Sequence, residues 1–134
     1  MKFLVFCAAI ILCLIYLEIP GQSQPIAGSV KIIDGDTIKI GSEKIRLMGF
    51  DTPEMDARCT REKRLALKAR DRLTVLIGRG ELTINRHGED RWGRTLAYVR
   101  SQGQDVGTVL IKEKLARPYE GGKRQGWCSG SALS

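Results

Sequence analysis

Histidine is scarce in this sequence, which contains one among 134 residues. That residue, His87, stands in a polar stretch, "NRHGED", and we expect it to be an exposed turn residue. No histidine or cysteine spacing typical of a metal site accompanies it. Because no convincing Ser-His or Cys-His pair is present either, a metal-and-carboxylate mechanism is favoured over histidine-based catalysis.

The N-terminal apolar run is too short to be a typical membrane span. It covers Phe3 to Leu17, 15 residues, follows the lone positive charge of Lys2, and precedes small residues up to Ser23. A bilayer span needs about 20 residues, so residues 1–23 are predicted to be a signal peptide, followed by a linker at 24–28. We therefore expect a secreted or periplasmic protein. An uncleaved N-terminal membrane anchor remains the alternative.

Cysteine is also sparse. Two of the four cysteines lie within the predicted signal peptide, which leaves Cys59 and Cys128 in the exported part. In an oxidising compartment two cysteines predict one disulfide, and here it would fasten the C-terminal tail.

Charge is abundant by contrast. Removing residues 1–23 takes away Lys2 and Glu18, so 21 basic and 14 acidic residues and a net charge of +7 remain. A basic exported domain suggests a polyanionic partner such as nucleic acid, although basic solvated surfaces are common.

The apolar patterning predicts a mainly β fold with helices. Short runs with period-two alternation or strand composition are separated by Gly-, Asp- and Ser-containing turns, whereas spacings of three and four residues indicate helices. The expected strands are 29–33, 37–40, 44–50, 81–85 and 95–99, and the expected helices are 60–77 and 105–116. Three hairpin strands, a helix and two more strands are the element order of a five-stranded OB-fold Greek-key barrel.

Three acidic residues follow the ends of these runs. Asp36 leaves the first turn, and Asp51 and Glu54 lie after the third run, so one rim of a barrel can bring them together. Clustered carboxylates repel one another and would be stabilised by a hard cation such as Ca²⁺, with the Thr52 carbonyl as a further oxygen ligand. The pattern is not an EF-hand. The alternative is an ordinary turn at "DGDT" and a loop entering a helix at "DTPE".

Two arginines fit chemistry at phosphorus. Arg46 lies in the third run and Arg94 in "DRWGR" before the fifth. A guanidinium can bind two phosphoryl oxygens at once, so the pair could stabilise the charge that develops during phosphodiester hydrolysis. The alternative is that both are solvated surface arginines.

The motifs "IIDGDTIKI", "IRLMGFDTPE", "EDRWGRTLAYV" and "VLIKEKLARPY", in this order, resemble the staphylococcal (thermonuclease-like) nuclease family. The resemblance implies a nuclease domain at 29–119 with an OB core and about three helices, and an irregular tail at 120–134. It implies a monomeric, calcium-dependent endonuclease that hydrolyses DNA and RNA and leaves 3′-phosphate and 5′-hydroxyl ends. No stable protein partner is implied, and membrane contact is expected only if the N-terminal segment is uncleaved.

The resemblance also assigns roles to individual residues. Asp36, Asp51 and the Thr52 carbonyl would bind Ca²⁺, Glu54 would position or deprotonate the attacking water, and Arg46 and Arg94 would stabilise the transition state. Tyr119 would line the nucleotide pocket, although a plain packing role is equally compatible with its position.

Two features depart from the family pattern. The segment "MDARC" after Glu54 is short, and the Cys59–Cys128 pair would hold the basic tail "GGKRQGWC" beside the active rim, where its basic residues could follow a phosphate backbone. Two other functions stay open: a non-catalytic OB-fold module that binds nucleic acid, and a structural calcium-binding domain, which would leave both arginines unexplained.

Overall fold

The computed structural model describes residues 29–129. The predicted signal peptide, the linker at 24–28 and the last five residues of the tail lie outside this range. Within it the chain forms eight strands and two helices. In chain order these are β1 (Val30–Asp34), β2 (Thr37–Ile40), β3 (Glu43–Leu47), β4 (Gly49–Asp51), α2 (Thr60–Ile77), β5 (Leu82–Glu89), β6 (Thr95–Ser101), β7 (Gln104–Asp105), α3 (Val106–Lys112) and β8 (Arg117–Tyr119).

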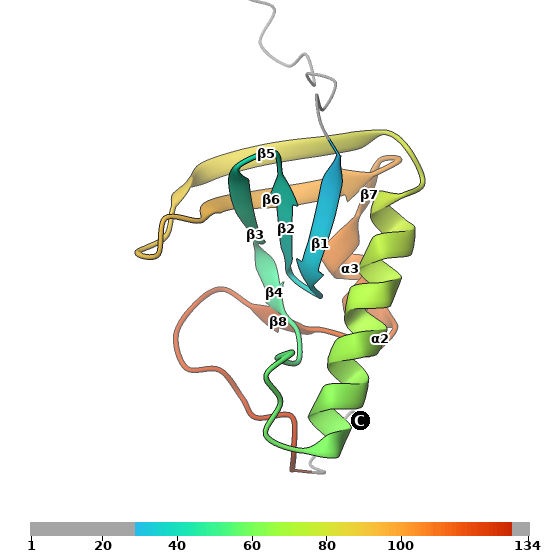
Figure 1. The fold of residues 1–134 in the computed structure, drawn as a ribbon, viewed down its shortest axis with the longest axis vertical. Coiled ribbons are helices and arrows are strands. Elements are labelled where there is room, and N and C mark those ends of the chain that lie inside the picture. The colour runs from blue at the N-terminus through green and yellow to red at the C-terminus, as the bar shows by residue number, and fades with distance from the viewer. Residues whose placement is uncertain (1–28, 130–134) are drawn as a thin grey trace, which may run out of the picture.

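The strands form one large sheet and one small one (Figure 1). The large sheet has the order β1-β2-β3-β6-β5, with β7 added to β6. Its β3–β6 pairing is parallel, and the other pairings are antiparallel. The small sheet pairs β4 with β8. The expected mainly β fold with helices, of OB type, is thereby confirmed, although the described residues contain two helices rather than about three.

The core forms where the large sheet meets the two helices. In β2 and β3 the apolar side chains of Ile38, Ile45 and Leu47 are fully buried. Helix α2 contributes the matching apolar face, with Ala69 and Leu73 also fully buried. This period-three-and-four stripe explains why α2 begins and ends at the residues that the sequence predicts.

Four local predictions were imprecise. The run 44–50 is not one strand, because the chain turns at Gly49, whose φ of 87° favours glycine, and continues as β4. The second helix ends at Lys112 instead of residue 116. No strand was expected at 117–119, which form β8, and His87 lies in β5 as an exposed strand residue instead of in a turn.

The C-terminal tail crosses back toward the start of α2 (Figure 1). Residues 120–129 contain no helix or strand. Cys128 forms a disulfide with Cys59, which is the N-cap residue of α2. No helix in the described part of the chain combines the length and the apolar composition needed to span a bilayer.

Candidate active site

The turn between β1 and β2 fixes the position of Asp36. At Gly35 the backbone packs so closely that an added Cβ would lie 2.8 Å from both Ala69 Cβ and Thr52 Oγ1. The amide of Asp36 donates to Asp34 Oδ1 at 3.1 Å, and Thr37 Oγ1 donates to Asp36 Oδ1 at 3.1 Å. Only 7% of Asp36 is exposed, so its carboxylate is held inside the fold with a defined orientation.

Asp51 reaches the same place from the end of β4. The amide of the next residue, Thr52, donates to Asp36 Oδ2 at 3.2 Å. Arg46 Nη2 lies 3.1 Å from Asp36 Oδ2 and 3.5 Å from Asp51 Oδ1. Two carboxylates that are 15 positions apart in the chain are therefore joined by one guanidinium.

The Arg46 side chain is itself buried, with 5% of the residue exposed. Besides the two carboxylates, its guanidinium donates to the carbonyl of Leu47 and, at 3.0 Å, to the carbonyl of Phe50. These carbonyls flank the turn between β3 and β4, so the backbone orients the guanidinium. A buried charge is tolerated here because two carboxylates and two carbonyls compensate it.

The crowding of acids is reflected in their proton affinities. Burial, and then the charge of Asp36, raise the pKa of Asp34 from 3.8 to about 6. Burial is also the main reason why the pKa of Asp51 is raised, with Asp36 and Glu54 adding to the effect and Arg124 and Arg46 opposing it. The cluster therefore holds more negative charge than its environment stabilises well, and a cation would relieve this.

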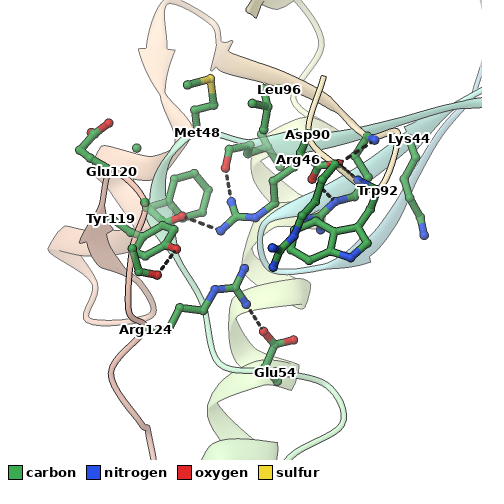
Figure 2. Close-up of a pocket in the computed structure, with 17 residues that line it drawn as sticks. Lys44, Arg46, Met48, Glu54, Asp90, Trp92, Leu96, Tyr119, Glu120 and Arg124 are labelled. Atoms are coloured by element: carbon green, nitrogen blue, oxygen red, sulfur yellow. Dashed lines mark hydrogen bonds and ion pairs between the residues drawn. The ribbon is translucent and has the colours of Figure 1, made fainter. Parts of the chain in front are cut away.

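A pocket of about 750 Å³ opens in front of Arg46. Figure 2 shows Glu54, Tyr119 and Arg124 on one side of it and Trp92 on the other. Glu54 is the most open of the three acids expected to act together, with 54% of its side chain exposed.

Arg94 borders the same pocket from the start of β6. Its Nε lies 2.7 Å from Asp90 Oδ2, and its guanidinium carbon lies 5.3 Å from the ring centre of Trp92. The ion pair and the indole hold the arginine at the pocket edge, where 22% of its side chain is exposed.

Arg124 completes the cluster from the tail. Its Nε lies 3.2 Å from Asp51 Oδ1, and its Nη1 forms an ion pair with Glu54 Oε1. Its guanidinium carbon also lies 5.7 Å from the ring centre of Tyr119, whose hydroxyl donates to the Gly122 carbonyl at 2.8 Å. One arginine thus links the acid at the end of β4 to the acid in the following loop.

The structure brings most of the expected site residues into one region. Asp36, Asp51 and Arg46 are in direct contact, and Glu54 joins them through Arg124. Arg94 and Tyr119 line the pocket without contacting the buried acids. The main-chain amide of Thr52 donates to Asp36 Oδ2, which ties the backbone of Thr52 to the acid cluster.

Sequence reasoning did not single out Asp34 or Arg124. The doubled acid in "DGD" was a signal for Asp34, but the motif was interpreted as a turn with one functional residue. For Arg124 the available signal was the basic tail next to Cys128. It indicated that the tail lies near the rim, but not which of its basic residues enters the site.

The donor set suits a hard divalent cation. Asp36 and Asp51 supply carboxylate oxygens on adjacent backbone segments, and both residues are more than nine-tenths buried. Ca²⁺ prefers such oxygen ligands, whereas zinc prefers softer nitrogen and sulfur ligands.

The fold and the site together define an OB-type protein with an acid-and-arginine cluster at the base of a charged pocket. The model of the family described as "Staphylococcal nuclease homologue" matches residues 44–127. That match covers more than half of the chain, and the chain therefore belongs to the staphylococcal nuclease family.

Individual relatives agree with this assignment. The chain is 32% identical to the succinoglycan biosynthesis protein ExoI of Rhizobium meliloti (strain 1021) over 78% of its own length and 58% of that protein. It is 38% identical to a thermonuclease of Staphylococcus intermedius over 65% of its length and 55% of that protein. It is 35% identical to endonuclease YncB of Bacillus subtilis (strain 168) over 65% of its length and 44% of that protein. The chain spans about half the length of these curated relatives.

Proposed function

We propose that this protein is a calcium-dependent endonuclease that hydrolyses the phosphodiester bonds of DNA and RNA. The single observation that carries the proposal is the contact of Arg46 with both Asp36 and Asp51 at the base of a pocket that Glu54 and Arg94 also line. Relatives named as a thermonuclease and as endonucleases support the same chemistry.

The buried acids are the proposed calcium ligands. Asp36 and Asp51 would bind the ion, with the Thr52 carbonyl as a third donor. Bound there, the ion supplies Lewis-acid stabilisation of a phosphate oxygen. Arg46 and Arg124 bring two positive charges against the three carboxylates of Asp36, Asp51 and Glu54, so the cluster keeps a net negative charge that attracts a cation.

The exposed groups of the pocket are the proposed agents of hydrolysis. The Glu54 carboxylate would accept a hydrogen bond from water and direct it at phosphorus. The guanidinium groups of Arg46 and Arg94 would donate to the phosphoryl oxygens as negative charge increases on them. Attack with departure of the 5′ oxygen leaves a 3′-phosphate and a 5′-hydroxyl, the product ends that we propose.

The pocket walls suit a nucleotide. Tyr119 offers an aromatic face on one side, and the net charge of +7 favours a polyanion. We propose that the enzyme accepts both DNA and RNA and acts as a monomer, as the resemblance to the thermonuclease-like family implies.

A cleavage assay tests this function. Purified protein should nick plasmid DNA and degrade RNA with Ca²⁺ and should do neither with a chelator, and end-labelling should detect 3′-phosphates. Nucleic-acid binding without cleavage under any divalent ion would instead establish the non-catalytic OB module. Calcium binding without any affinity for nucleic acid would establish the structural calcium-binding domain.

We also propose that the protein acts outside the cytoplasm, after removal of residues 1–23. The support is the charge and hydropathy pattern of that segment together with the disulfide between Cys59 and Cys128. An intact-mass measurement of protein recovered from the culture medium or the periplasm should show the loss of about 23 residues.

A further inference from the structure

Arg124 is held in the site by a segment that is anchored at both ends. On one side, the tail leaves β8, which is paired with β4. Directly after β8 the chain turns through Gly121 and Gly122, whose φ angles of 105° and 89° strongly favour glycine. The start of the tail is therefore attached to the same strand that carries Asp51.

The other end of the tail is anchored more strongly. Trp127 is 3% exposed, and the Arg117 guanidinium carbon lies 3.7 Å from the centre of its ring. Arg117 Nη1 also donates to the Gly126 carbonyl at 2.9 Å, and Cys128 is bonded to Cys59. The five residues between Gly122 and Cys128 thus bridge two fixed points, with Arg124 among them.

The guanidinium of Arg124 lies between two acids with different proposed tasks. Its Nε lies 3.2 Å from Asp51, a proposed calcium ligand, and its Nη1 pairs with Glu54, the proposed acceptor of water. Asp36, Asp51 and Glu54 carry three negative charges against the single positive charge of Arg46. Arg124 brings the second positive charge, at the place where a cation would otherwise be attracted.

We propose that Arg124 is a positioning residue of this active site, which holds Glu54 beside Asp51 and competes with the divalent cation for the Asp51 carboxylate. The proposal rests on the proposed function of the same site. It predicts two opposite effects of removing the Arg124 guanidinium: calcium binding becomes stronger and catalysis becomes weaker.

Calcium titration provides the first test. The full-length metal-stripped protein is titrated with CaCl₂ by calorimetry, without nucleic acid. Arg124→Ala should bind Ca²⁺ about three- to tenfold more tightly than the wild type, since a charge 3.2 Å from a ligand is removed from a partly exposed position. Arg124→Lys, which keeps the charge, should lie between the two. Lys123→Ala, an exposed neighbour, should bind as the wild type does.

Steady-state kinetics provide the second test. At saturating Ca²⁺, Arg124→Ala should lower kcat on plasmid DNA about tenfold, because Glu54 loses the partner that fixes its orientation, and Arg124→Lys should restore part of that loss. A residue that only stabilised the tail would lower the melting temperature and weaken calcium binding instead.

The outcomes separate this inference from the proposed function. If the wild type binds Ca²⁺ and cleaves nucleic acid but Arg124→Ala leaves the calcium affinity unchanged or weaker, the inference is overturned and the function stands. If the wild type neither binds Ca²⁺ nor cleaves, both are overturned. Tighter calcium binding combined with slower turnover in Arg124→Ala supports the inference.

Discussion

At the scale of single residues, the balance of charge between neighbouring side chains decides which site residues can be changed without loss of folding. Asp36 and Asp51 are both more than nine-tenths buried, and Arg46 Nη2 approaches each within 3.5 Å. Removing the Arg46 guanidinium from this cluster would leave two buried carboxylates without the charge that joins them. The exposed members of the pocket, by contrast, can be changed with little effect on folding.

Glu54 and Arg94 allow activity to be separated from stability. Glu54→Gln and Arg94→Ala should each lower kcat at least about a hundredfold, because the proposed roles of both groups are toward water or phosphate and not toward the core. The unfolding free energy of Glu54→Gln in urea should stay within about 0.5 kcal/mol of the wild type, as is usual for an exposed position. Arg94→Ala also removes the ion pair with Asp90 and should cost up to about 1 kcal/mol.

Matched controls are available for both variants. Glu89→Gln and Arg100→Ala change the same residue types at exposed positions that do not line the pocket, and they should retain full activity. Normal turnover in Glu54→Gln would contradict its proposed role in directing water.

Asp51 should link calcium binding to stability. Because burial raises the pKa of Asp51, its charge costs folding energy when no cation is bound. Asp51→Asn should therefore melt within a few degrees of the metal-free wild type, but should lose the rise in melting temperature that Ca²⁺ gives the wild type. Thermal melts with calcium and with chelator measure both effects. A calcium-induced shift that persists in Asp51→Asn would show that the ion binds elsewhere.

At the scale of elements, the turn between β1 and β2 positions the site. Gly35→Ala should destabilise the protein by about 1–3 kcal/mol, because its Cβ would meet Ala69 and Thr52 at 2.8 Å and push Asp36 out of place. Urea unfolding checks the stability, and calcium titration checks the site. Ser42→Ala in the exposed turn between β2 and β3 is the control and should change little. A fully stable Gly35→Ala would mean that the turn can relax.

Elements with a strong local signal were predictable from the sequence. Helix α2 coincides with its predicted range because its apolar stripe is regular and its first and last residues are bounded by Cys59 and Gly78. Strand β8 was missed because three residues that include Pro118 show no alternation, and they form a strand only because β4 lies beside them.

The site residues also divide into those that a local sequence pattern predicts and those that long-range contacts position. Asp36 and Asp51 were found because turns that end neighbouring strands gather at one rim. The burial of Arg46 depends on the carbonyls of Leu47 and Phe50, which become partners only after the chain turns at Gly49. The position of Arg124 depends on a tail whose path is set by the disulfide and by Trp127. No local pattern encodes either of these long-range contacts.

At the scale of the whole molecule, the disulfide joins segments separated by 69 positions. In the chain-entropy model, closure of such a loop stabilises the fold by about 4 kcal/mol. The double variant Cys59→Ser, Cys128→Ser should therefore unfold at a much lower urea concentration than the wild type, with the m-value as a check on two-state behaviour.

Reduction of the wild type with dithiothreitol should reproduce the result for the double variant, and dithiothreitol should leave the variant itself unchanged. Equal stability of the wild type and the variant would indicate that Trp127 and Arg117 hold the tail without the covalent link.

The pairing of β4 with β8 also determines when the site can assemble. A ribosome delivers this chain from its N-terminus, and Asp51 emerges long before the partner strand at Arg117–Tyr119 has been made. Until then β4 is a three-residue edge without a neighbour, and the residues that follow Tyr119 have not been synthesised. We therefore expect nascent chains to be inert toward the messenger RNA that encodes them until β8 and the residues that follow Tyr119 have been made.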